Sequence, residues 1–220
     1  MIYRKITKKY YFSVEGETEQ WYLKWLQDTI NSSGTASCRV SIDCPVQKNP
    51  LKRAKSINNT GKVEIWHLSD YESNDEIHQK QFMETMDQMK AAKNLKKQVT
   101  YQFGYSNFTF DLWMILHMAD CRQSFAHRKN YITPLNKAYG ENFENMDEYK
   151  YETNFKRCLG KLSIQNVIHA IHRAKQIMEI NKQNGYVLHQ YKGYRYYKEN
   201  PSLTVWEIVE QILTDCGLMQ

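Results

Sequence analysis

The sequence lacks the marks of a secreted, membrane-bound or disulfide-stabilised protein. Its five cysteines are scattered, odd in number and form no CxxC pair, so we expect reduced thiols in a cytoplasm rather than disulfides or a zinc site. The basic opening, MIYRKITKKYY, lacks the apolar stretch of a signal peptide, and no apolar run is long enough to span a bilayer. We therefore expect a cytoplasmic protein with no membrane partner.

Other absences narrow the chemistry. The chain has no GxxxxGK[ST] sequence, so a step driven by a nucleoside triphosphate would need another protein. Its 220 residues are 41% apolar, which is enough to bury a core within one domain. The formal net charge of +6 favours anionic partners by long-range steering, although basicity of this size is common among unrelated proteins.

The first half of the chain alternates predicted strands and helices. β-branched and aromatic residues in alternation predict strands at Tyr10–Val14, Cys38–Cys44, Val63–Leu68 and Gln98–Phe103. Apolar residues at helical spacing predict helices at Glu19–Ile30, Pro50–Ile57 and Asp75–Asn94. Strands and helices that alternate with short links favour a mainly parallel sheet flanked by helices, which is an α/β fold.

The second half is predicted to be largely helical. Helical spacing continues at Phe108–Met118, Ile164–Ile180 and Leu203–Leu213, whereas strand patterns fade. We therefore predict a single domain over residues 1–220, with an α/β core at about 8–106 and a helical extension at about 107–220.

Two acidic segments follow predicted strands. EGETE (residues 15–19) follows the first strand and SDYES (residues 69–73) follows the third. Parallel strands end at one edge of a sheet, so Glu15, Glu19, Asp70 and Glu72 are expected to converge there. Carboxylates so close need compensation, and oxygen ligands suit one or two Mg²⁺ or Mn²⁺ ions, which also bind phosphate. The alternative is that each segment is only a helix start or a solvated turn.

Several neighbouring residues allow two interpretations. Gly16 permits a sharp turn or a positive φ, which would let the backbone approach a phosphate. Asn107 either binds phosphate or a metal-bound water, or caps the helix that follows, and we favour the cap. Asp111 either points back to the metal site or lies at a wet surface. His117 and His67 are expected to be buried polar groups rather than catalysts.

The acidic segments carry a resemblance to a known family. VEGETEQWYLKWL (residues 14–26) resembles the first motif of TOPRIM domains, in the form VEGxTExxY of RloB-like proteins, which are related to OLD-family nucleases. DYE (residues 70–72) resembles the DxD after the third TOPRIM strand. SNFTFDLWMILH, AIHRAKQI and ENPSLTVWEIVEQIL are similar to later RloB-like segments, SNPxFExWLLLH among them. The resemblance covers residues 10 to about 213.

The resemblance implies roles for particular residues. It implies that Glu15 is a metal ligand or a general acid/base, that Glu19 is the second acid of that motif, and that Asp70 and Glu72 are magnesium ligands. It also implies a TOPRIM, Rossmann-like fold and a part in bacterial defence against phage. Related OLD-like systems carry an ATPase, so the implied partner of this chain is a separately encoded ATPase or restriction-type protein.

The sequence departs from the family pattern at three positions. Glu72 replaces an aspartate and moves its carboxylate outward by one methylene. Asp111 replaces a glutamate, and Phe108 stands where proline is frequent. Because the two acidic replacements keep their charge, they put the metal geometry in doubt without removing the expected ligands.

Basic residues provide weaker candidates for phosphate binding. Lys52, Arg53 and Lys55 follow the second strand, and Lys5, Lys8, Lys9 and Lys48 are further basic candidates, although such runs are usually solvated. YKGYRYYKE (residues 191–199) interleaves tyrosines with cations, as in surfaces that stack unpaired bases. Packing within the protein is the favoured interpretation of that segment.

Three functional hypotheses follow. The first is a nuclease that uses Mg²⁺ or Mn²⁺ to cleave DNA or RNA, with Glu15, Asp70 and Glu72 as catalytic residues and Asp111 as a further metal ligand. The second is a non-catalytic module that binds or senses nucleic acid and recruits an ATPase or nuclease. The third and weakest is phosphoryl transfer to a small molecule, because the same cation geometry serves it.

Overall fold

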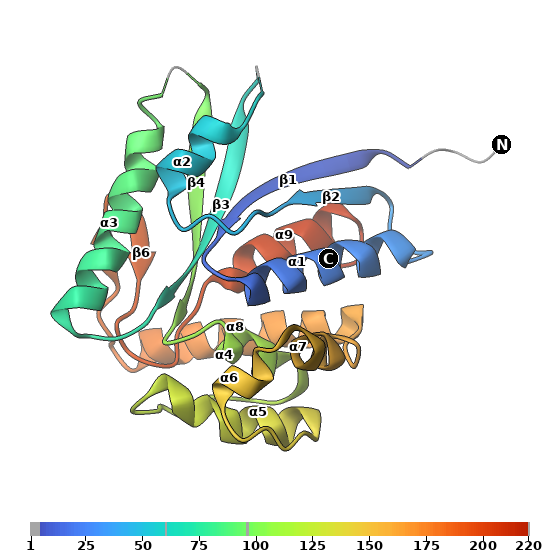
Figure 1. Ribbon diagram of the computed structural model, residues 1–220, viewed down its shortest axis with the longest axis vertical. Helices are drawn as coiled ribbons and strands as arrows, with labels where there is room; N and C mark the ends of the chain where they lie inside the picture. The colour runs from blue at the N-terminus through green and yellow to red at the C-terminus, as the bar shows by residue number, and fades with distance from the viewer. Residues whose placement is uncertain (1–4, 60, 96, 220) are drawn as a thin grey trace.

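The core of the protein is a four-stranded parallel sheet. The computed structural model describes residues 5–59, 61–95 and 97–219. The strand order is β2-β1-β3-β4, with β1 at Thr7–Val14, β2 at Arg39–Asp43, β3 at Val63–Tyr71 and β4 at Val99–Asn107. Helices cover both faces of this sheet (Figure 1), which confirms the predicted α/β, Rossmann-like fold.

The alternation of side chains in the strands builds two apolar layers. In β3, Val63 and Ile65 face one layer, whereas Trp66 and Leu68 face the other. The first layer is closed by α2 (Pro50–Ser56) and α3 (Glu76–Ala92), and the second by α1 (Glu17–Ser32) and α9 (Val205–Asp215). β1 and β3 are central strands with both faces covered, and the residues at their polar carboxyl ends, Glu15 and Asp70, are partly buried.

Local capping fixes where several helices begin. The Asn49 side chain accepts a hydrogen bond from the Lys52 N–H, and Pro50 occupies the first turn of α2. The Asp75 side chain likewise accepts from the His78 N–H at the start of α3. Each cap satisfies an amide that the helix itself leaves unpaired.

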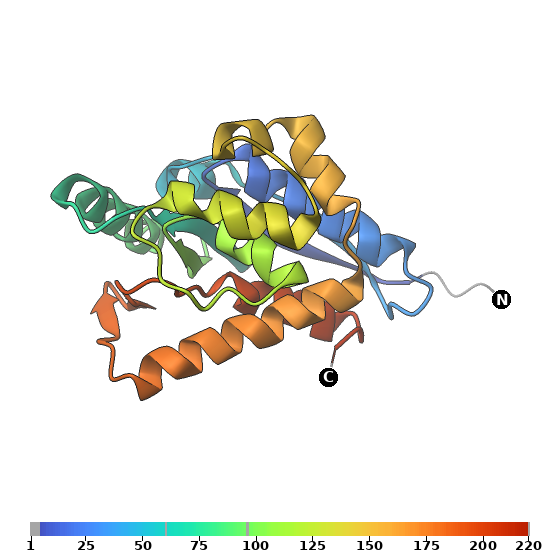
Figure 2. The same ribbon diagram turned by 90° about the horizontal axis from the view of Figure 1, so that it is seen from below.

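The second half is mainly helical, as predicted. Helix α4 (Asp111–Met118) packs along the long helix α8 (Ile164–Gln183), and α8 in turn contacts α9 (Figure 2). Between α4 and α8 lie four short elements that the sequence patterns did not indicate: η1 at Arg128–Tyr131, α5 at Ile132–Tyr139, α6 at Met146–Tyr149 and α7 at Glu152–Leu159. Among the described residues, no helix has the length and apolarity needed to cross a membrane.

Residues 197–204 pair with the edge strand β4, and we call this segment the clamp. An antiparallel hairpin of β5 (His189–Tyr191) and β6 (Tyr194–Tyr196) precedes the clamp in the chain, so the tyrosine-rich segment is a packed structural element. The Asn107 side chain donates to the carbonyls of Tyr197, Lys198 and Glu199, at 3.3, 3.0 and 3.1 Å. The expected helix cap at Asn107 was therefore wrong, because its amide holds the chain that follows the hairpin.

Backbone pairing extends this clamp along β4. The Asn107 N–H donates to the Ser202 carbonyl and the Thr204 N–H donates to the Tyr105 carbonyl, each at 2.8 Å. These bonds satisfy outward-facing groups of an edge strand that would otherwise face solvent. All five cysteines are buried and free, and the thiols of Cys38 and Cys216 lie 3.0 Å apart, where the end of α9 meets the start of β2.

The strands run further than the sequence patterns indicated. β3 was predicted to end at Leu68 and β4 at Phe103, but they continue to Tyr71 and Asn107. Apart from Gly104 the added residues are polar or aromatic, and their parallel pairing places Asp70 opposite Ser106. Pairing within the sheet therefore outweighs the polarity that suggested a loop, and it holds Asp70 in a strand.

We expect Asn107→Ala to destabilise the fold. Removing the amide leaves the Lys198 carbonyl without its donor, whereas Ser202 Oγ still donates to the carbonyls of Tyr197 and Glu199. An unsatisfied buried group of this kind costs about 1–3 kcal/mol. Urea unfolding should show a loss of about 2 kcal/mol in the free energy of unfolding. The exposed Asn94→Ala is the matched control and should be close to neutral. Equal stabilities for the two variants would contradict the clamp.

Candidate metal and phosphate site

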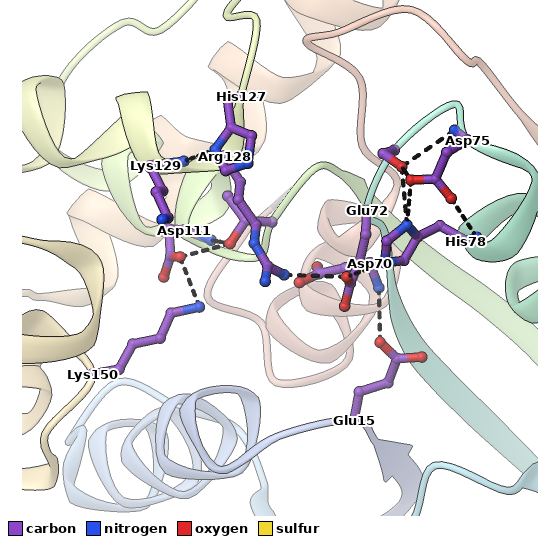
Figure 3. A network of polar contacts seen from close by, with 12 residues as sticks. Glu15, Asp70, Glu72, Asp75, His78, Asp111, His127, Arg128, Lys129 and Lys150 are labelled. Carbon is purple, nitrogen blue, oxygen red and sulfur yellow. Dashed lines mark hydrogen bonds and ion pairs between the residues drawn. The ribbon is translucent and has the colours of Figure 1, made fainter.

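The two acidic segments meet at the carboxyl end of the sheet. Strands β1 and β3 are neighbours, with Val14 paired to Leu68, so the residues that follow them lie side by side. The Glu15 Oε1 atom accepts a hydrogen bond from Ser69 Oγ at 2.9 Å, and its Oε2 atom accepts from the Asp70 N–H at 3.2 Å (Figure 3). The structure thus brings Glu15 and Asp70 together, 55 positions apart in the sequence.

Glu19 completes the acidic group from the first turn of α1. Its carboxylate is buried, and its Oε2 atom accepts from Thr18 Oγ1 at 3.0 Å. Gly16 is extended, with φ −141° and ψ 175°, so the positive φ considered from the sequence does not occur. A Cβ atom on Gly16 would lie 3.0 Å from Glu19 Oε2. The glycine therefore makes room for a carboxylate.

Burial gives these acids unusual protonation behaviour. Removal from water raises the pKa of Glu15 to about 7, although its hydrogen bonds from Ser69 and Asp70 oppose the rise. Burial, followed by the charges of Glu19 and Glu15, raises the pKa of Asp70 well above its ordinary value. Burial also raises the pKa of Glu19. The group therefore retains protons at a pH where exposed carboxylates are ionised, and a nearby cation would favour its ionised form.

A lysine from the helical half already supplies one cation. The Lys150 Nζ atom, just after α6, lies 3.1 Å from Asp111 Oδ2 at the start of α4 (Figure 3). Thr109 Oγ1 donates to the same oxygen at 2.6 Å, whereas the buried Oδ1 atom has no partner among the described residues. The Asp111 charge raises the pKa of Lys150 to about 12. Asp111 therefore lies buried beside the acidic group and not at a wet surface, which was the other possibility considered from the sequence.

Glu72 has a different environment from the other acids. Its Oε2 atom lies 3.2 Å from Arg128 Nη1 and 3.1 Å from His78 Nε2, and His78 Nδ1 lies 2.6 Å from Asp75 Oδ2. In Figure 3 Arg128 reaches from η1 towards Glu72. Glu72 is therefore already compensated by basic groups and ties η1 to the loop before α3.

These residues line a cavity of about 300 Å³. Its wall includes Glu15, Glu19, Asp70 and Glu72, together with the cations Lys48, Arg128 and Lys150. Across the described parts of the chain, no three Asp, Glu, His or Cys side chains are grouped closely enough to hold a metal ion as they stand. Metal binding would therefore require at least one carboxylate to rotate. The buried Oδ1 atom of Asp111, which has no partner among the described residues, would gain a ligand bond if a metal ion were bound there.

Other candidates from the sequence lie outside this cavity. Arg53 is buried in α2, where Nε donates to the Phe12 carbonyl and Nη2 lies 2.9 Å from Asp43 Oδ1. Lys52 and Lys55 are exposed on the same helix and do not line the cavity. Asn107 is engaged in the clamp on β4. None of these four residues is placed to contact a phosphate held among the acids.

The two histidines are buried polar groups, as expected. His117 Nδ1 lies 2.8 Å from the Trp113 carbonyl and Nε2 lies 3.2 Å from Tyr22 Oη. His67 Nδ1 lies 2.7 Å from Ser13 Oγ. Burial lowers the pKa of His117 to about 4 and that of His67 to about 3, so both are neutral near pH 7.

Lys150, Arg128 and Ser69 were not among the residues predicted from the sequence. Lys150 and Arg128 reach the cavity through short helical elements whose patterns were too weak to predict. Ser69 lies in the SDYES segment, so its position next to Asp70 offered a signal. Phe108 has a φ of 68°, which proline, fixed near −65°, cannot adopt, so the backbone here is incompatible with the proline of the resembled pattern.

The raised pKa of Glu15 predicts a pH-dependent effect of Glu15→Gln. The folded pKa of about 7 exceeds the ordinary glutamate pKa of 4.5, so the folded state keeps a proton that the unfolded state has lost. Stability contributed by this group therefore falls as pH rises from 4.5 to 7. The variant should gain stability relative to the wild type over that range, by at most about 3 kcal/mol.

Urea unfolding at several pH values, with chelator present, measures this difference. Glu84→Gln is the control, because that side chain is exposed on α3 and its difference from the wild type should not change with pH. A Glu15→Gln difference that stays constant from pH 5 to 8 would show that Glu15 titrates normally.

Comparison with known proteins identifies the family of the chain. A family model described as RloB-like protein matches residues 10–212, which is nearly the whole chain, so the chain belongs to this family. No curated protein and no solved structure was found to match.

Proposed function

We propose that this RloB-like protein is a phosphodiesterase that uses Mg²⁺ or Mn²⁺ to cleave nucleic acid. The observation that carries the proposal is the pairing of Glu15 with the Asp70 backbone in a cavity that also holds Glu19 and three cations. Buried acids with raised pKa values, next to basic groups at the carboxyl edge of a parallel sheet, are typical of a functional site.

The donor set fits a hard divalent cation. Carboxylate oxygens of Glu15, Glu19, Asp70 and Asp111 are the ligands that Mg²⁺ and Mn²⁺ prefer, and Asp111 Oδ1 is buried without a partner in the described structure. Glu72 is a further ligand if it leaves Arg128 and His78. When bound, one or two such ions would polarise the phosphate and neutralise charge that develops on its oxygens.

The side chains of the cavity have complementary roles in this proposal. Glu15 has a pKa of about 7 and is oriented by Ser69 and the Asp70 N–H, so it is suited to take a proton from the attacking water near neutral pH. Lys150 and Arg128 would bind the non-bridging oxygens of the phosphate, because both line the same cavity as the acids.

The alternative is a binding module without turnover. It is favoured by the absence, in the described part of the chain, of a ready group of three metal-ligating side chains, and by the ion pair in which Lys150 already neutralises Asp111. In that case the protein would bind or sense DNA or RNA and recruit a separately encoded ATPase or nuclease. The family resemblance favours a role in defence against phage under either proposal.

Cleavage assays with carboxylate variants test the proposal. Purified protein should cleave a panel of single- and double-stranded DNA and RNA with Mn²⁺ or Mg²⁺, and chelator should abolish cleavage. Glu15→Gln and Asp70→Asn should each lower the rate by about 100-fold or more, because they remove a proton acceptor and a cation ligand. The exposed Glu84→Gln should retain the wild-type rate.

A plating assay links this activity to defence. Cells that carry the wild-type protein and its genetic neighbours should resist phage, and Glu15→Gln should abolish resistance. No cleavage of any substrate, together with full protection by Glu15→Gln, would exclude the catalytic proposal and leave the binding module.

We expect Gly16→Ala to weaken metal binding without unfolding the protein. The added methyl group would lie 3.0 Å from Glu19 Oε2 and must displace that carboxylate. Calorimetric titration with Mn²⁺ should show an affinity lower by about tenfold, as when a group that orients metal ligands is lost. Gly34→Ala is the control, because nothing lies within 4 Å of its added Cβ. Equal Mn²⁺ affinities for both variants would remove Glu19 from the ligand set.

A further inference from the structure

A groove leads away from the acidic cavity across the helical half. The cavity of about 300 Å³ shares Arg128 and Lys150 with a second hollow of about 490 Å³. The second hollow shares Lys129 and Ile132 with a third of about 810 Å³, which extends to Lys137 on α5. The three hollows therefore lie next to one another in a row, and η1 and α5 form much of the wall beyond the acids.

The groove is lined by three lysines that form no ion pair among the described residues. Lys48 lines the first hollow, Lys129 the second and third, and Lys137 the third. All three are exposed, and none forms an ion pair with a carboxylate among the described residues. These lysines can contact an anion without first leaving a carboxylate, whereas Lys150 and Arg128 are also paired with Asp111 and Glu72.

The second hollow has more uncompensated acidic side chains than the third. Glu144 and Asp147 line the second hollow, where they oppose Lys129. Asp120 lines the third hollow, but it lies 3.7 Å from Arg122 and 3.5 Å from Arg173, so its charge is compensated. The net positive part of the groove is therefore the third hollow, around Lys129 and Lys137.

The wall of the third hollow is also apolar. It includes Phe125, Ile132 and Pro134, and Phe125 packs against Tyr131 with ring centroids 4.7 Å apart. An apolar wall edged by lysines matches the two faces of an unpaired nucleotide, a flat base and a charged phosphate. A duplex offers its phosphates to such a surface but keeps its bases stacked inside, so the apolar wall would gain nothing from it.

We propose that an unpaired nucleic-acid strand lies along this groove, with phosphates beside Lys129 and Lys137 and bases against the apolar wall. The proposal rests on the proposed function and narrows its substrate class to single-stranded DNA or RNA. The strand then continues past Arg128 to the carboxylate cavity.

Binding without cleavage tests the groove separately from catalysis. Fluorescence anisotropy in chelator would use a labelled single strand of about 20 nucleotides, longer than the span of a typical single-strand site, and the same sequence as a duplex. The wild type should bind the single strand at least about tenfold more tightly than the duplex. Lys129→Glu with Lys137→Glu should weaken single-strand binding by about tenfold or more and make the salt dependence shallower.

A variant with the same change in charge provides the control. Lys62→Glu with Lys93→Glu alters two exposed lysines near the opposite end of the sheet, at the start of β3 and after α3, and should change the affinity by less than about threefold. Thermal unfolding of both variants, each compared with the wild type, ensures that lost binding is not lost folding.

Three results would overturn the groove. The first is that the control variant weakens single-strand binding as much as the groove variant does. The second is that the duplex binds as tightly as the single strand. The third is that the groove binds a labelled acidic peptide and neither nucleic acid. If the groove variant keeps both wild-type binding and wild-type metal-dependent cleavage, the groove proposal is rejected and the nuclease proposal stands. If binding depends on the groove lysines but no metal supports cleavage, the nuclease proposal is rejected and the groove proposal stands.

Discussion

The cost of holding several carboxylates out of water at one end of a parallel sheet is the constraint on which the rest of the structure depends. Glu15 is oriented by two donors from β3, and Glu19 is accommodated by the missing side chain of Gly16. Burial raises the pKa values of Glu15 and Asp70, and repulsion among the acids raises them further. A fold of this kind is stable only if protons or cations compensate the carboxylates, and the basic side chains of the cavity supply part of that compensation.

The helical half is best understood as the source of that compensation. Asp111 and Lys150 enter the site from α4 and from the turn after α6, and Arg128 enters from η1. The parallel sheet alone would present acids at an open edge. With the helical half in place, the same edge becomes a cavity with charges of both signs, and this is the environment in which a phosphate can be held close to carboxylates.

The sequence was most informative where one physical rule dominated. Alternation and helical spacing located the sheet and the long helices, and the rule that parallel strands end together brought Glu15 and Asp70 to one place. The polar ends of β3 and β4 were missed because sheet pairing outweighed local polarity. Lys150 and Arg128 were missed because they belong to short elements held by tertiary packing, and Arg53 was misjudged because its carbonyl partners are invisible to a charge pattern.

The clamp on β4 has a consequence for the order of events during synthesis. The residues that close this edge, from Tyr197 to Thr204, leave the ribosome about 90 positions after the strand that they cover. Until then the nascent sheet has an open side, and the residues around its acids are only partly assembled. A ribosome-bound chain would thus lack the finished carboxylate cavity of the folded protein.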